Sequence, residues 1–346
     1  MTNVLSYRDV QRHLDDVRNK YLLLGNGFSI ALRHDIFSYE SLYKHANLTE
    51  APHLEGLFEA LGTQDFEIVI RQLADAARLI SIYRPEETEL FQALTADARK
   101  LKQILVEAIA SRHPDRPYDV SVEQYQRCRT FLAPFGHIYT LNYDVLLYWA
   151  LMQDEVDDLN IRPDDGFRHP EDNPDEPYVS WQEAHKPTVH YLHGALHLFD
   201  TGADIVKYTW SKTDIPIVEQ IRASLDAENY PLFVAEGTSL SKRAKIMHNA
   251  YLHKALRSFE GCANTSNASM VIYGHSLADN DQHVLRLIER GKVSQLYVSL
   301  YGPPDTEANQ ATISAAERLA VNRSERRKRD LLEVTFFDAE SAQIWG

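Results

Sequence analysis

The stretch YLLLGNGFSIAL at residues 21–32 decides the fold class expected for this chain. Residues 21–24 form a short continuous apolar run, which is typical of a strand buried on both faces of a sheet. Gly25-Asn26-Gly27 ends this run abruptly, and residues 28–32 continue with helical character. The sequence therefore predicts a buried strand, a glycine turn and a helix in immediate succession.

The alternation of strand and helix continues along the chain, because further apolar runs predict strands and helical patterns lie between most of them. Strands that alternate with helices pair in parallel, so we expect an α/β fold with a Rossmann-like, mostly parallel sheet covered by helices on both faces. The predicted strands are residues 137–141, 188–192, 205–208, 231–235, 269–273, 295–300 and 333–337, and the predicted helices are the first fifteen residues, 239–259, 279–290 and 306–321.

Two segments interrupt this pattern. Residues 55–131 have apolar residues at three- and four-residue spacing almost throughout, so they predict a helical insertion within one domain spanning residues 1–346. Residues 154–177 are rich in Asp, Glu and Pro and predict an acidic surface loop. A calcium loop is the alternative there, but the required order of oxygen ligands with a central Gly and a closing Glu is missing.

The composition is that of a folded protein without a general nucleic-acid surface. The 346 residues carry a formal charge of −14, which disfavours a broad phosphate-binding face. Cys128 and Cys262 stand far apart, so neither a disulfide framework nor a four-cysteine zinc ribbon can form. The charged amino terminus and the lack of a long apolar run predict neither secretion nor a membrane span. We therefore expect a cytoplasmic protein.

The glycine turn has the composition of an anion site. Backbone amides of the turn and of the following helix are expected to point at one spot, and the lack of a side chain at Gly25 and Gly27 lets a pyrophosphate approach. Ser29 could cap the helix or bond a phosphate oxygen. The motif lacks the third glycine of the dinucleotide fingerprint, so a plain structural turn is an equal alternative.

Asn142 and Asp144 directly follow the predicted strand 137–141. The carboxyl ends of parallel strands are where open α/β sheets bind their ligands, so both residues are candidate site residues. The alternative is that Asn142 caps a helix beginning at Asp144, a role compatible with ligand binding.

His193 closes the predicted strand 188–192. A neutral imidazole there could take a proton near pH 7, although a lone His at a strand end is more often structural. His190 and His197 also suggest a metal, but the helical zinc-protease signature needs Glu where Gly194 stands. We therefore expect no metal.

A second ligand loop is predicted at residues 274–281, between an apolar strand and a helix. The Ser276 hydroxyl and the Asp279 carboxylate suit ribose hydroxyls, although both would also make good helix caps. A hydrolase nucleophile elbow would need a glycine where Ala278 stands.

In their order and spacing, the segments GNGFS, LNYDVL, LHG and YGHSLADND resemble the sirtuin-like proteins of bacteria. The chain looks most like the divergent branch that includes NAD-hydrolysing subunits of anti-phage defence systems. The resemblance implies a set of roles: Gly25, Asn26, Gly27 and Ser29 hold the NAD pyrophosphate and ribose, Asn142 and Asp144 line the nicotinamide-ribose pocket, His193 is the base, and Gly274, Ser276 and Asp279 meet the adenosine half.

The chain also departs from the sirtuin pattern. Asn26 replaces the usual Ala, Leu141 replaces the Gln that normally precedes the Asn, and the four zinc cysteines of protein deacylases are missing. The missing zinc module weakens a deacylase interpretation, because the acyl-lysine cleft of that family lies beside the module.

The resemblance therefore favours hydrolysis of NAD to ADP-ribose and nicotinamide, in an effector of anti-phage, abortive-infection defence. Because such an activity would be toxic if unregulated, we expect activation by homo-oligomer assembly or by a partner defence protein. The alternatives are a non-catalytic sensor that binds NAD or ADP-ribose, and an NAD-dependent deacylase or ADP-ribosyltransferase with a protein acceptor.

Overall fold

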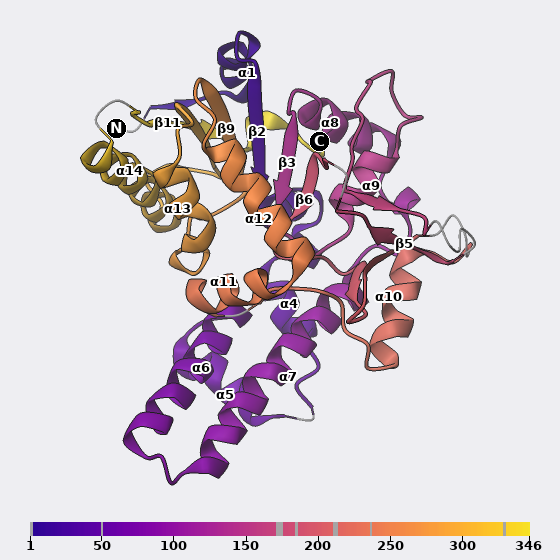
Figure 1. Cartoon of the computed structure of the whole chain (residues 1–346), viewed down its shortest axis with the longest axis vertical. Helices are drawn as coiled ribbons and strands as arrows, with labels where there is room; N and C mark the ends of the chain where they lie inside the picture. Colours follow the sequence, from indigo (N-terminus) through magenta and orange to yellow (C-terminus); the bar gives the residue numbers. More distant parts are fainter. Residues whose placement is uncertain are drawn as a thin grey trace.

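The apolar run at residues 21–24 belongs to strand β2 (Asn19–Leu24), which lies inside a seven-stranded sheet (Figure 1). Leu22, Leu23 and Leu24 are fully buried there. Every pair of neighbouring strands in this sheet is parallel, which confirms the predicted fold class. The structure is a computed structural model that describes residues 3–49, 51–170, 176–183, 186–209, 214–235, 237–327 and 330–346.

The register of the sheet brings the carboxyl ends of its strands to one edge. Leu22 of β2 pairs with Ile138 on one side and with Val271 on the other. The strand order is β1-β11-β10-β9-β2-β3-β6. The six strands besides β2 are β1 (Val4–Leu5), β3 (His137–Thr140), β6 (Val189–Tyr191), β9 (Ala268–Tyr273), β10 (Gln295–Leu300) and β11 (Glu333–Asp338).

Helices cover both faces of this sheet. Tyr139 of β3 packs on Phe259, whereas Tyr273 of β9, which points to the opposite face, packs on Phe131. Phe259 belongs to α12 (Ala250–Ala263), next to α11 (Ser239–His248) and α13 (Gln282–Arg290), and Phe131 belongs to α8 (Val122–Leu132). The remaining helices around the sheets are α1 (Tyr7–Asp15), α2 (Gly27–Leu32), α9 (Leu146–Met152), α10 (Ile217–Asp226), α14 (Glu307–Arg326), η2 (Asp279–Asp281) and η3 (Glu340–Ala342).

The described part of residues 33–132 is helical and contains no strand. Helices α6 (Phe66–Tyr83) and α7 (Thr88–Arg112) pack together as a hairpin that projects away from the sheet (Figure 1). The shorter elements here are α3 (His34–Phe37), α4 (Tyr39–His45), α5 (His53–Leu61) and η1 (Pro117–Asp119). None of the described helices is long and apolar enough to cross a membrane.

A second, antiparallel sheet lies outside the predicted pattern. The predicted strand 205–208 is confirmed as β8 (Ile205–Tyr208), but it belongs to this sheet, whose order is β4-β5-β8-β7. Its other strands are β4 (Phe167–Arg168), β5 (Tyr178–Trp181) and β7 (Leu198–Asp200). These strands have two to four residues, too few for a period-2 pattern to be recognised.

The predicted strand 231–235 is wrong. This segment forms only an isolated bridge between Phe233 and Gly194. Its backbone instead bonds the loop after β6: the amide of Val234 donates to the carbonyl of His193, and the amide of Ala195 donates to the carbonyl of Leu232. The apolar segment is therefore buried as a support for the loop that carries His193.

Two further expectations need correction. The predicted helix 239–259 is divided at Asn249, whose side chain accepts from the Leu252 amide and caps α12. The acidic segment 154–177 is solvated only in part, because Phe167 is buried and the Asp165 carboxylate accepts from the buried Lys207. Residues 171–175 of this segment lie outside the described residues.

Candidate functional site

A cavity of about 870 Å³ opens at the carboxyl edge of the parallel sheet. This volume is in the range of about 300–1,000 Å³ found for small-molecule and cofactor sites. Residues from the loops after β2, β3, β6, β9 and β10 line it, together with residues of the helical insertion and of the segment 343–346. Of the predicted site residues, Gly25, Asn26, Gly27, Asn142, Asp144, His193, Gly274 and Ser276 line this cavity, whereas Ser29 and Asp279 do not.

The two glycine loops pack backbone against backbone. The Gly27 amide donates to the Gly274 carbonyl at 2.8 Å, and a Cβ at Gly27 would lie 2.5 Å from the Gly274 Cα. Gly274 has φ +69°, and its own Cβ would lie 2.6 Å from the Gly27 Cα. These glycines are thus required by the contact between loops, even before any ligand is considered.

The anion site expected from the turn amides is largely absent in this structure. The amides of Gly25, Gly27 and Phe28 already donate to the carbonyls of Tyr273, Gly274 and Gly25. Because the turn is anchored on the loop after β9, its amides satisfy the protein backbone first. The structural alternative, a plain turn anchored on the loop after β9, therefore accounts for the hydrogen bonds of these amides.

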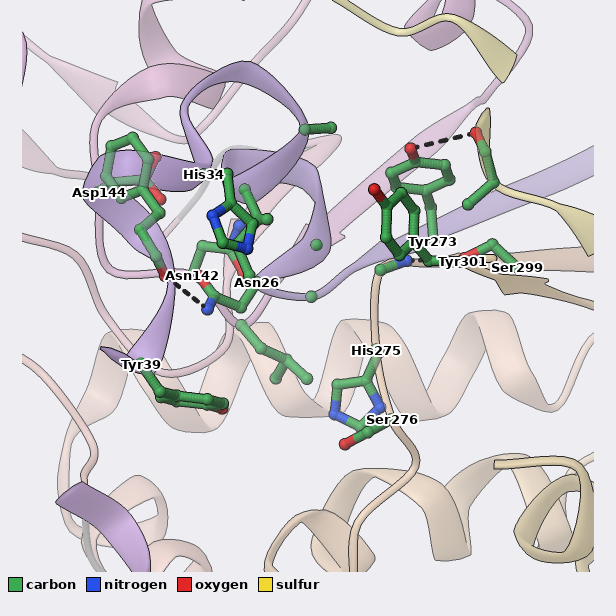
Figure 2. Close-up of a pocket in the computed structure, with 18 of the residues that line it drawn as sticks. Asn26, His34, Tyr39, Asn142, Asp144, Tyr273, His275, Ser276, Ser299 and Tyr301 are labelled. Atoms are coloured by element: carbon green, nitrogen blue, oxygen red, sulfur yellow. Dashed lines mark hydrogen bonds between the residues drawn. The ribbon is translucent and has the colours of Figure 1, made fainter. Parts of the chain in front are cut away.

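Ser29 is fully buried behind the cavity wall, between Asn142 and Asp144. Its hydroxyl donates to Asp144 Oδ2 at 2.5 Å and accepts from Asn142 Nδ2 at 2.9 Å. Burial raises the pKa of the Asp144 carboxyl, although the bond from Ser29 opposes this shift. Ser29 thus orients the two residues that line the cavity, and Figure 2 shows Asn142 and Asp144 beside Asn26.

The alternative role of Asn142 as a helix cap is wrong. Helix α9 begins at Leu146, and Asp144 Oδ1 accepts from the Leu146 amide at 2.9 Å. The backbone of Asn142 is held separately, because its amide donates to Thr140 Oγ1. The side-chain amide of Asn142 is therefore committed to Ser29 and the cavity, not to the helix.

His193 lies in a tightly fixed loop after β6. The next residue, Gly194, has φ +76°, and a Cβ there would lie 1.9 Å from the Leu232 carbonyl oxygen. His193 is only 2% exposed, and its Nε2 lies 3.0 Å from His283 Nε2. Burial, reinforced by the ammonium of Lys242, lowers the pKa of His193 well below its ordinary value. The imidazole is consequently neutral at pH 7 and able to accept a proton.

A buried ionic network closes the floor of the cavity next to His193. Lys242 of α11 is 1% exposed, and its Nζ donates to Glu67 Oε2 at 2.6 Å and to Asp281 Oδ1 at 2.9 Å. Burial alone would lower the pKa of Lys242, but the two carboxylates raise it overall. The same ammonium holds the pKa of Asp281 well below its ordinary value, although burial opposes this shift. The network links the hairpin helix α6 to the loop after β9.

Among the described residues, one group of side chains has the spacing of metal ligands. The ligand atoms of His193, Asp281 and His283 all lie within 4.8 Å of one another. However, Lys242 Nζ is bonded to the Asp281 oxygen, so this carboxylate already neutralises a cation. His190, in contrast, bonds the Pro187 carbonyl and is not in the group. Within this group, the His193 and His283 rings are in direct contact, with their Nε2 atoms 3.0 Å apart.

Sequence reasoning missed Glu67, Lys242 and His283. Glu67 and Lys242 stand in amphipathic helical patterns, where a charged residue is normally assigned to the solvent face. For Lys242 a signal exists, because it is one helical turn from Ile246, the other buried residue of α11. His283 lies in α13, just beyond the predicted ligand loop at residues 274–281.

The far end of the cavity is built by β9, β10 and the segment 343–346. Figure 2 shows Ser299 and Tyr301 grouped with Tyr273, and His275 and Ser276 further along the loop after β9. The Gly274 amide donates to Ser299 Oγ at 2.9 Å, which anchors this loop on β10. Asp279, expected in the site, is exposed outside the cavity.

Comparison with known proteins gives a family and a distant likeness. The model of a domain of unknown function, DUF4917, matches residues 22–345. No curated protein matches the chain. A sirtuin from a study of the structural basis of sirtuin substrate affinity is 14% identical over 91% of this chain and 99% of its own, with a TM-score of 0.39. Sir2Tm bound to a propionylated peptide is 13% identical over 90% of this chain and 97% of its own, with a TM-score of 0.35.

Proposed function

We propose that this chain, which belongs to the DUF4917 family, binds NAD in the cavity at the sheet edge and hydrolyses its nicotinamide–ribose bond. The observation that carries the proposal is that separate segments of the chain converge on one cavity. Four segments that resemble sirtuin motifs, far apart in the sequence, meet at this one cavity through Asn26, Asn142, His193 and Ser276. A cavity that combines apolar walls with a few convergent polar groups is the usual form of a cofactor or substrate site.

The dinucleotide would lie across the loops after β2, β9 and β10. Its nicotinamide-ribose end would face Asn142 and His193, and its adenosine end would face Ser276 and Ser299. The amides of the glycine turn are largely committed to the backbone, so the wall's polar side chains supply most of the binding contacts. Asn26 is held for this purpose by its bond to the Phe37 carbonyl.

The chemistry that these residues support is heterolysis of the glycosidic bond. The bonding electron pair moves to the pyridine nitrogen, so nicotinamide leaves as a neutral molecule and the ribose becomes oxocarbenium-like. Asn142 positions the sugar, and Ser29, which is itself bonded to the buried Asp144, holds Asn142 in place. Water then adds to the ribose carbon while His193, neutral at pH 7, accepts its proton.

The direct test is to incubate the purified protein with NAD and to measure free nicotinamide. We expect release without any acceptor, and we expect Asn142→Ala to lower turnover by about 10²-fold or more while leaving the fold intact. Asn160→Ala is the matched control, because Asn160 is an asparagine that does not line the cavity. Unchanged turnover in a folded Asn142→Ala protein would exclude the assigned role.

The same assay separates the alternatives. Release of nicotinamide only with a protein or peptide acceptor would identify a transferase or deacylase, and NAD binding without release would identify a sensor. An effector role in anti-phage defence is a further part of the proposal. It predicts that expression depletes cellular NAD during phage infection and that Asn142→Ala abolishes both the depletion and the protection.

A further inference from the structure

We propose that His283 is a positioning residue for His193, fixing its tautomer and taking over its proton during each turnover. The inference rests on the proposed hydrolase function for its kinetic part. Its structural basis is the direct contact of the two rings, whose Nε2 atoms are 3.0 Å apart and whose planes are nearly parallel, at 21°.

The two ring nitrogens of His283 have different contacts: Nε2 faces His193 Nε2 at 3.0 Å, and Nδ1 lies 3.4 Å from Ser239 Oγ. We assign the ring proton of His283 to Nδ1, which then donates to the Ser239 hydroxyl. Burial lowers the pKa of His283 to about 4, so the neutral ring has one proton and its Nε2 carries a lone pair.

The tautomer of His193 follows from that of His283. Because His283 Nε2 is an acceptor, His193 Nε2 must carry the proton of the short contact. The Nδ1 atom of His193 then carries the lone pair and bonds no described residue. His193 itself lines the cavity, so this nitrogen is the one available to a reacting hydroxyl or water.

The surrounding charges favour the transfer of a proton between the two rings. Asp281 Oδ1 lies 3.8 Å from His193 Nε2, where it stabilises an imidazolium that forms transiently. His275 Nδ1 accepts from the Leu277 amide, so His275 Nε2 carries a proton and donates to Asp281 Oδ2 at 2.9 Å. Together with Lys242, His275 keeps Asp281 ionised and in place.

The step balances without any further reactant. As water bonds the ribose carbon, one of its protons moves to His193 Nδ1. The proton on His193 Nε2 moves to His283 Nε2, and the proton on His283 Nδ1 leaves toward the partly exposed Ser239. One proton is taken up at the cavity and one is released at the surface. After the products leave, a solvent proton that enters at Ser239 returns along the same path, and His193 Nδ1 releases its proton to water in the cavity, which restores both tautomers and leaves one net proton released per turnover.

Nitrogen-15 NMR of histidine-labelled protein tests the tautomers independently of any activity. We expect His193 to be protonated at Nε2 and His283 at Nδ1, with resonances assigned by His193→Gln and His283→Gln. The opposite tautomer in either ring would overturn the inference. So would one equivalent of bound metal that both substitutions remove, because the lone pairs would then be metal ligands.

The kinetic arm uses His283→Ala with and without free imidazole. We expect turnover to fall by about 10²-fold, with KM for NAD within about twofold, and imidazole in the vacated space to restore much of it. His190→Phe, at another buried histidine outside the cavity, is the control and should keep wild-type turnover. Full turnover in folded His283→Ala, or a loss that imidazole does not restore, would overturn the relay. No NAD cleavage by the wild type would instead contradict the proposed function, and the NMR result would still decide the tautomers.

Discussion

Replacing Lys242 by methionine would keep the length of the side chain and remove the ammonium between two buried carboxylates. Glu67 and Asp281, which bond this ammonium at 2.6 and 2.9 Å, have side chains that are only 17% and 12% exposed. Removing one partner of a buried ion pair typically costs about 3–5 kcal/mol, because the remaining charge stays in a poorly solvated place. We expect a loss of this size, a large part of the about 5–15 kcal/mol by which proteins are stable.

Protonation of a neighbouring carboxyl limits the size of this loss. Burial already raises the pKa of Glu67, so Glu67 would take up a proton in the Lys242→Met protein and limit the penalty. The folded-state pKa of Glu67 in this variant would then exceed its unfolded value. The contribution of Glu67 is most favourable at low pH and is lost as the pH rises, so the difference from the wild type should be largest near pH 7 and smaller near pH 4.

Urea unfolding followed by circular dichroism measures these differences. The double variant with Glu67→Gln should recover part of the loss, with an interaction energy of about 0.5–3 kcal/mol in the mutant cycle. Lys254→Met is the control, because this exposed lysine lies 3.9 Å from Glu183 and should contribute less than about 1 kcal/mol. A loss below about 1 kcal/mol in Lys242→Met, or no recovery in the double variant, would refute the argument that the network holds α6 on the sheet.

Three further predictions concern the loops, the pH and the cavity wall. Gly27→Ala should lower the free energy of unfolding by about 1–3 kcal/mol and weaken NAD binding in calorimetry, because the added Cβ would lie 2.5 Å from the Gly274 Cα. Gly56→Ala is the control and should not destabilise the protein, because a Cβ there would have nothing within 4 Å. Trp345→Ala should cost about 3–5 kcal/mol and enlarge the cavity, since the indole is 3% exposed and donates to the Phe28 carbonyl; unaltered melting would contradict this. Unfolding at pH 5 should need less urea than at pH 7. Burial lowers the pKa of three histidines from 6.5 to about 4 on folding, namely His113, His190 and His283. The contribution of each to the free energy of unfolding is lost as the pH drops through 6.5, by about 2 kcal/mol at pH 5.

The sequence predicts the elements whose signal is local. The run at residues 21–24 is apolar because β2 is covered on both faces, and β9 and β10 are recognised for the same reason. The segment 231–235 has an equally apolar pattern but supports a loop, since burial alone does not specify a sheet partner. Hydrophobic patterns thus predict what is buried, and the partner depends on the whole fold.

Of the candidate site, only the residues that directly follow a strand can be predicted from the sequence. Asn142 and His193 can be placed because parallel strands bring their carboxyl ends together. The network of Glu67, Lys242 and Asp281 cannot be found in this way, because 175 residues separate the first two and each charge is ordinary in its own helix. Their burial is a property of the packing between α6, α11 and η2.

The wall of the cavity has a consequence for the order in which the protein becomes functional during synthesis. Strand β2 needs β9, whose residues leave the ribosome some 250 positions later, and Ile344 and Trp345 complete the wall. A chain still being translated therefore exposes an unpaired apolar strand and has no closed site. If the cavity consumes NAD, that activity cannot arise before residues 343–346 have been translated, and chaperone protection of β2 should matter most in that interval.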